Sequence, residues 1–123
     1  MPKRKQRRVE SPSPRSLPEY SLVLAERAQD DFEDIILYTE QTWGEKQADE
    51  YASVIRRALQ SLKQNPRMGH SRSELRPGYR CFHAGRHLIL YRIEASIVYV
   101  VSILHERMDV RIHLDEPSGF FDL

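Results

Sequence analysis

Arginines recur through the second half of the chain at positions where they could bind anions. Five of them lie along apolar segments or in the turns between those segments: Arg76, Arg80, Arg86, Arg92 and Arg107. A guanidinium group binds phosphates and carboxylates through two parallel hydrogen bonds. We expect several of these side chains to converge on an exposed sheet face, which an anionic or acidic partner would meet.

His105 could add proton transfer to this arginine set. With Glu74 or Glu106 nearby in the sequence, its imidazole could carry out acid/base cleavage of RNA while the arginines neutralise phosphate charge. The opposing interpretation is an ordinary basic surface that docks a protein. The spacing of the residues alone does not choose between the two.

Cysteine and the other histidines suggest weaker alternatives. Cys81 and His83, two apart on one strand face, could form a thiolate–imidazole pair, but no oxyanion site or third orienting residue accompanies them. A partly buried cysteine is the better interpretation. His83, His87 and His105 lack the ligand spacing of a zinc site, so we interpret them as surface histidines. The sequence therefore predicts no metal and no cofactor.

Two helices must precede the strands that carry these residues. Apolar side chains recur every three or four positions over residues 26–43 and again over 45–64, with Gly44 placed to end the first helix. Asp30, Asp31, Glu33 and Asp34 crowd the opposite face of the first helix, which we interpret as solvent-facing. Asn65-Pro66 closes the predicted antiparallel helix hairpin.

Strands supply the flat partner on which this hairpin packs. A short β-type run covers residues 20–24, and extended segments follow around residues 79–82, 87–92 and 97–104, with turns at Gly85 and at residues 94–96. The order is β-α-α-β-β-β. We predict an α+β two-layer sandwich, in which the helix hairpin covers one face of a mainly antiparallel sheet.

The chain divides into one folded domain and two tails. Its 123 residues suffice for one domain only. Residues 1–18 hold six Lys or Arg and one Glu in a Pro/Ser-rich stretch, which predicts a disordered basic tail. The domain spans 19–114 and a second tail spans 115–123. Without an apolar membrane span or secretory signal, and with a single cysteine, we expect a cytoplasmic protein.

Charge is distributed unevenly within the domain. Residues 26–66 contain nine acids and five bases, whereas residues 67–113 contain eight arginines, four acids and all five histidines. A cationic face therefore belongs to the strand half.

Several motifs together resemble the ParE branch of the RelE/ParE toxin superfamily, over residues 20–114. They are Ala28-x3-Phe32-x2-Ile35, Asn65-Pro66-x2-Gly69, Arg76-Pro-Gly-Tyr-Arg80, Gly85-x-His87-x-Ile-x-Tyr91-Arg92 and, above all, Ile103-Leu-His-Glu-Arg-Met-Asp109. The resemblance implies the toxin half of a bacterial type II toxin–antitoxin system. A ParD-like antitoxin would neutralise it and would link it indirectly to operator DNA.

The resemblance also implies a choice of target. ParE-type members inhibit DNA gyrase without enzymatic activity, whereas RelE-type members cleave mRNA on the ribosome. The chain has no lysine after Lys63 and no tyrosine after Tyr99, which departs from the nuclease pattern and favours a gyrase inhibitor. A toxin fold that has lost toxicity is the third possibility.

Site residues follow from these alternatives. The predicted antitoxin contacts are Tyr38, Trp43 and Tyr51, although Trp43 could instead be core at the hairpin tip. The predicted target contacts are Arg80, Arg86, His105 and Arg107. A nuclease would use Arg80, Arg92 and His105. Arg107 could alternatively pair with Asp109 and hold the end of the domain.

Overall fold

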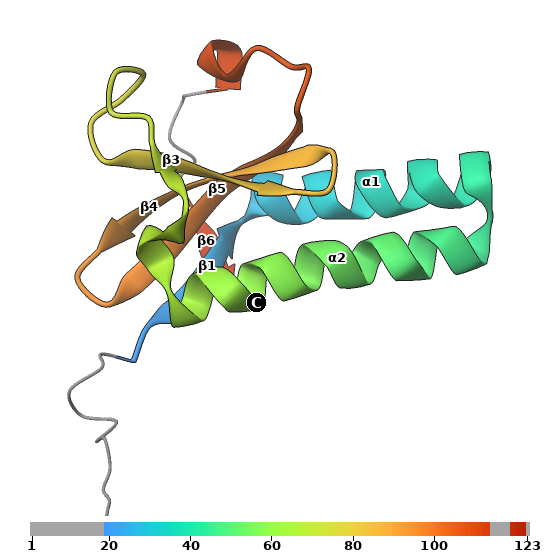
Figure 1. Ribbon diagram of the computed structural model, residues 1–123, viewed down its shortest axis with the longest axis horizontal. Coiled ribbons are helices and arrows are strands. Elements are labelled where there is room, and N and C mark those ends of the chain that lie inside the picture. Colours follow the sequence, from blue (N-terminus) through green and yellow to red (C-terminus); the bar gives the residue numbers. More distant parts are fainter. Residues whose placement is uncertain (1–18, 114–118, 123) are drawn as a thin grey trace, which may run out of the picture.

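The chain forms one strand, two long helices and then the remaining strands of a single sheet (Figure 1). The computed structural model describes residues 19–113 and 119–122, so the predicted tail at 1–18 lies outside the described residues. The elements are β1 (Ser21–Ala25), α1 (Glu26–Trp43), α2 (Glu45–Gln64), η3 (Pro66–Met68), β2 (His70–Ser71), β3 (Tyr79–Ala84), β4 (His87–Glu94), β5 (Ile97–His105), η4 (Val110–His113) and β6 (Phe120–Asp122).

The two long helices begin and end where the sequence pattern predicts. Gly44 has a φ of 97° and its N–H donates to the carbonyl of Glu40 at 2.9 Å, which ends α1. Its own carbonyl then accepts from the N–H of Ala48 at 3.1 Å in the first turn of α2. Glycine adopts this backbone conformation without the strain that a side chain would add. The sharp reversal therefore makes α1 and α2 an antiparallel hairpin.

The sheet has the order β2-β3-β4-β5-β1-β6. Strands β3, β4 and β5 form an antiparallel meander, while β1 lies between β5 and β6, parallel to the first and antiparallel to the second. The mainly antiparallel sheet and the hairpin on one face confirm the predicted fold. The edge strands β2 and β6, of two and three residues, were not predicted.

Apolar side chains fill both faces of the sheet. The face under the helices packs Ile55, Leu59, Ile89, Tyr91 and Val100 into the main core. The opposite face packs Tyr79, Cys81, Leu90, Val101 and Val110. Cys81 is buried there, more completely than the sequence interpretation expected, and burial raises the pKa of its thiol. In Figure 1 the segment before β3 and the segment after β5 lie over this second face.

One carboxylate of α1 turns inward and completes the edge of β5. The pairing of β1 with β5 ends at Leu24 and Val100, so β5 continues without a neighbouring strand on that side. Asp31 accepts hydrogen bonds there from the backbone N–H of Ile103 at 2.9 Å and from Ser102 Oγ at 2.7 Å. A buried N–H without a partner would be costly. The interpretation of this acidic run as solvent-facing is therefore wrong for Asp31.

Candidate functional site

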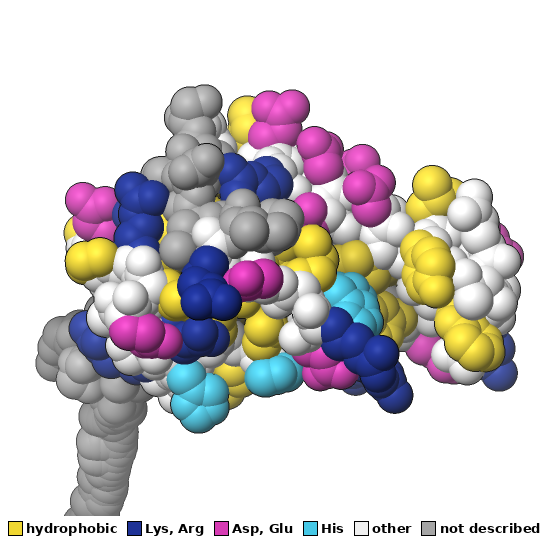
Figure 2. Space-filling view, turned by 90° about the horizontal axis from the view of Figure 1, so that it is seen from above, with side chains coloured by type: hydrophobic (Ala, Val, Ile, Leu, Met, Phe, Trp, Pro, Cys, Tyr) yellow, Lys and Arg dark blue, Asp and Glu magenta, His cyan; other side chains and the backbone are white. Residues whose placement is uncertain are grey.

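A groove of about 610 Å³ lies between the outer half of the helix hairpin and the β3–β4 turn. Its walls come from four elements: Ile35, Tyr38 and Trp43 of α1, Tyr51 of α2, Arg86 of the turn and His105 at the end of β5. Figure 2 shows histidine and basic side chains on the sheet side of a hollow, beside apolar side chains of the hairpin. The groove thus combines an aromatic wall with a cationic rim.

The aromatic wall is exposed. Tyr38 has 65% and Trp43 has 69% of its surface accessible, and Leu37, which precedes Tyr38 in the sequence, has 52%. The alternative that Trp43 is core at the hairpin tip is therefore wrong. Large apolar side chains grouped on a surface typically mark a partner site, and tryptophan and tyrosine often supply most of the binding energy there.

Tyr51 and two histidines form the floor. The Tyr51 hydroxyl lies 2.6 Å from Nδ1 of His87 and accepts a hydrogen bond from the backbone N–H of Arg86 at 2.9 Å. The rings of His87 and His105 meet edge to face, with centroids 5.3 Å apart. A Cβ on Gly85 would come within 2.7 Å of the Tyr51 ring, so glycine permits this contact. The floor is closely packed and internally hydrogen-bonded.

Burial keeps the imidazole of His87, in the floor of the groove, uncharged. Desolvation, helped by the neighbouring His105, lowers the pKa of His87 to about 4, although Glu106 acts in the opposite direction. Its imidazole is thus neutral near pH 7 and can accept a hydrogen bond at Nδ1. The cationic character of the rim at neutral pH therefore does not come from His87.

Arg86 supplies a guanidinium to the rim. Its side chain is 73% exposed, and its closest carboxylate is Glu106 at 3.8 Å. The backbone of the turn is fixed more firmly, because the carbonyl of Arg86 accepts from the N–H of Glu106 at 2.9 Å. The turn is held at both sides while the guanidinium remains available to solvent.

Arg80 lies outside the groove and has a structural partner set. Its Nη2 donates to the carbonyls of Arg67 at 2.9 Å and Gly69 at 2.7 Å, in the segment that follows α2. The hydroxyl of Tyr91 fixes the same segment: it donates to the carbonyl of Pro66 at 2.6 Å and accepts from the N–H of Gly69 at 3.2 Å. These contacts anchor the connection between α2 and the sheet.

Arg92 is also engaged elsewhere, on the sheet face away from the helices. Its guanidinium stacks 4.1 Å from the centre of the Tyr99 ring and lies 5.8 Å from that of Phe120. It also pairs with Glu94 at 2.9 Å. Arg80, Arg86 and Arg92 therefore lie in separate surroundings and do not converge on one face.

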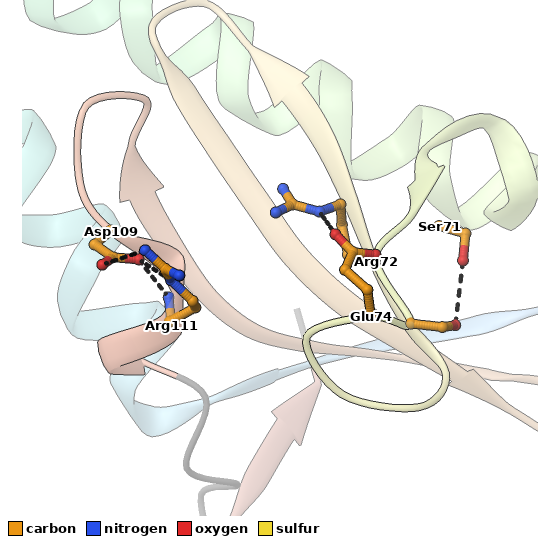
Figure 3. Close-up of polar contacts among 6 residues, drawn as sticks. Ser71, Arg72, Glu74, Asp109 and Arg111 are labelled. Carbon is orange, nitrogen blue, oxygen red and sulfur yellow. Dashed lines mark hydrogen bonds and ion pairs between the residues drawn. The ribbon is translucent and has the colours of Figure 1, made fainter.

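The remaining polar candidates pair with near neighbours in the sequence (Figure 3). Asp109 pairs with Arg111, two positions further along the chain, at 3.1 Å. Arg72 donates to Glu74 at 2.7 Å, and this bond holds the pKa of Glu74 below its usual value. The backbone N–H of exposed Arg107 donates to Nδ1 of His105 at 3.2 Å.

The structure thus assembles one part of the predicted set and disperses the rest. Tyr38, Trp43, Tyr51, Arg86 and His105 line the groove together, whereas Arg80, Arg92 and Arg107 do not line it. Their contacts with a partner or a target stay predictions.

Among the lining residues that were not predicted site residues, two are titratable, Asp34 and His87. The spacing of Asp34 and Tyr38, four apart on a helix, could have indicated the first.

Comparison with known proteins identifies the family. A family model described as the ParE toxin of the parDE type II toxin–antitoxin system matches residues 22–110. The chain belongs to the ParE toxin family. The resemblance inferred from the motifs is confirmed. As the toxin of a type II toxin–antitoxin system, this ParE-family chain has an antitoxin as its partner.

Named relatives agree with this membership. The ParE-family chain is 37% identical to Toxin ParE1 of Caulobacter vibrioides over 74% of its length and 94% of the relative. It is 39% identical to Toxin ParE1 of Mycobacterium tuberculosis over 72% of its length and 91% of the relative. A solved chain from the chromosomal ParDE system of P. aeruginosa shares the fold, with a TM-score of 0.63 and 19% identity over 71% of this chain and 96% of that chain.

In the part of this ParE-family chain that the structure describes, neither long helix is apolar enough to cross a membrane.

Proposed function

We propose that the groove binds the antitoxin and that the free toxin inhibits DNA gyrase by binding it. The observation that carries the first half is the exposed aromatic wall facing a cationic rim in one groove. Helix-in-groove or extended-segment recognition places apolar side chains in such a site and polar groups at its edge. Trp43 and Tyr38 are the anchors of the proposed antitoxin contact.

The second half is supported by how the other arginines are used. Cleavage of RNA requires phosphate-binding cations and a proton-transferring group at one place. Arg80 and Arg92 bind groups of the protein itself, away from His105. This arrangement favours inhibition by binding over catalysis. Arg86, His105 and Arg107 remain the proposed contacts with gyrase.

The antitoxin contact can be tested with the natural fluorescence of the protein. Trp43 is the sole tryptophan of the chain, so its emission reports on the groove alone. Addition of the ParD-like antitoxin from the same operon is expected to shift this emission to shorter wavelength, as the indole leaves water. Trp43→Ala should weaken antitoxin binding about tenfold or more, measured by calorimetry.

Phe121→Ala is the matched control for this test. Phe121 is also an exposed aromatic residue, with 51% of its surface accessible, but it lies on β6 at the other end of the sheet. The Phe121→Ala variant should bind the antitoxin with the same affinity as the unaltered protein. An unshifted emission spectrum in a formed complex would contradict the proposed groove.

The target can be tested with purified protein in two parallel assays. One measures supercoiling by gyrase and the other measures cleavage of ribosome-bound mRNA. We expect supercoiling to be blocked while the mRNA stays intact. Arg86→Ala should weaken this inhibition of gyrase. Arg57→Ala, which removes an exposed cation of α2, should not weaken it. Cut mRNA with unaffected gyrase would support the nuclease instead. No effect in either assay, with no growth defect, would indicate lost toxicity.

A further inference from the structure

We propose that the groove takes an antitoxin segment bearing a carboxylate at its β3–β4 end, where Arg86 binds it, and that Tyr51 positions Arg86 for this contact. The inference rests on the proposed antitoxin site and specifies its chemistry. It also changes the role of Tyr51 from a partner contact, as the sequence suggested, to a positioning residue.

The hydrogen bonds of Tyr51 are directed at the turn. Its oxygen accepts from the backbone N–H of Arg86 at 2.9 Å. The 2.6 Å separation from His87 Nδ1 is typical of an O–H donor, whereas the carbonyl of Ala84 lies at 3.4 Å. The hydroxyl proton is therefore committed to His87. A phenol has one proton to donate, so Tyr51 has none left for a partner.

His87 is suited to receive that proton only while its imidazole is neutral. The groups that face it are Tyr51, His105 and Glu106. Burial beside His105 disfavours a second positive charge, which leaves Nδ1 as an acceptor. The histidine thus orients the hydroxyl, and the hydroxyl holds the amide of Arg86. This network ties a residue of α2 to the turn between β3 and β4.

The charges around the groove place the carboxylate at one end. Asp34 lies in the α1 wall and repels an anion there. On the opposite rim, the guanidinium of Arg86 is exposed, and the 3.8 Å separation from Glu106 is too long for a hydrogen bond. An incoming carboxylate can make the two-pronged contact that Glu106 does not make. Because the backbone of the turn is already fixed, little of its freedom is lost on binding.

A double-mutant cycle tests the positioning role. The affinity for the ParD-like antitoxin of the same operon is measured by calorimetry for Tyr51→Phe, Arg86→Ala and the double variant. Arg86→Ala should weaken binding about tenfold, and Tyr51→Phe should weaken it by a smaller factor. The double variant should bind no more weakly than Arg86→Ala alone, because Tyr51 acts through Arg86. Tyr99→Phe, which removes a hydroxyl outside the groove, should leave the affinity unchanged.

Further measurements separate this role from a general loss of structure. His87→Phe removes the acceptor and should show the same dependence on Arg86, which provides a second cycle if Tyr51→Phe unfolds. Raised salt should weaken binding of the unaltered protein more steeply than binding of Arg86→Ala.

The outcomes are distinguishable from failure of the proposed antitoxin site. Additive losses in both cycles would overturn the positioning role. Unchanged affinity of Arg86→Ala, with binding still weakened by Trp43→Ala, would overturn the carboxylate contact alone. Unchanged affinity of Trp43→Ala would instead remove the antitoxin site on which the inference rests.

Discussion

At the scale of single residues, chemistry depends on what each side chain contacts. Arg80 and Arg86 are of one type and lie six positions apart, yet the first binds two carbonyls while the second is exposed on the groove rim. His87 was interpreted from the sequence as a surface histidine. In the structure its Nδ1 lies within hydrogen-bonding distance of the Tyr51 hydroxyl. Residue type defines what a side chain can bind, and its neighbours decide whether it is available.

His87 predicts how stability depends on pH. Its pKa is about 4 in the folded protein and 6.5 in its ordinary state, so the unfolded chain binds more protons between these values. The free energy of unfolding should therefore fall as the pH drops from 6.5 towards 4. Denaturant unfolding over this range should show a smaller fall for His87→Phe than for the unaltered protein. Equal falls would assign the titration to other groups.

At the scale of elements, the β3–β4 turn packs closely on α2 because a glycine in the turn has no side chain. Gly85 and Gly78 both have positive φ, 61° and 84°, so an alanine strains the backbone at either position. The ring of Tyr51 lies where a Cβ of Gly85 would be, whereas nothing lies within 4 Å of a Cβ at Gly78. The contact between turn and helix is thus specific to Gly85.

Two alanine variants separate these effects. Gly78→Ala should lower the free energy of unfolding by about 1 kcal/mol through backbone strain alone. Gly85→Ala should lower it by about 2–3 kcal/mol, because the collision with Tyr51 adds to that strain. Urea unfolding of both variants provides the comparison. Equal losses would show that Tyr51 moves aside at no cost.

At the scale of the whole molecule, the proposed partner surface and the core are separate. The outer half of the hairpin extends beyond the sheet, as Figure 1 shows. Trp43 lies at the end of α1 and is largely exposed, whereas Leu59 of α2 lies in the main core with 1% of its surface accessible. The proposed antitoxin contact at the hairpin tip therefore uses side chains other than those that hold the fold.

This separation predicts opposite effects for two helix variants. Trp43→Ala should change the free energy of unfolding by less than about 0.5 kcal/mol, whereas Leu59→Ala should lower it by about 2–5 kcal/mol. Thermal unfolding monitored by circular dichroism measures both. A strongly destabilised Trp43→Ala would mean that the hairpin tip contributes to the fold, and its loss of antitoxin binding would then need another explanation.

Local pattern by itself determined the elements of this protein. Helix boundaries at 26–43 and 45–64 follow from apolar spacing and from Gly44, and the three long closing strands follow from apolar, β-branched runs. The motifs also identified the family. Strands β2 and β6 were missed because two or three residues carry no periodicity, and they are strands only through pairing with β3 and β1.

Tertiary structure alone decided which candidates share a site. The sequence indicated the aromatic residues Tyr38 and Trp43 and the cationic residues Arg86 and His105 as two unrelated groups. They meet because the hairpin packs beside the β3–β4 turn. This turn lies more than 40 residues along the chain from either aromatic residue. Packing likewise gives Arg80 and Arg92 partners within the protein, away from the groove. Such contacts join distant residues, so local spacing carries no record of them.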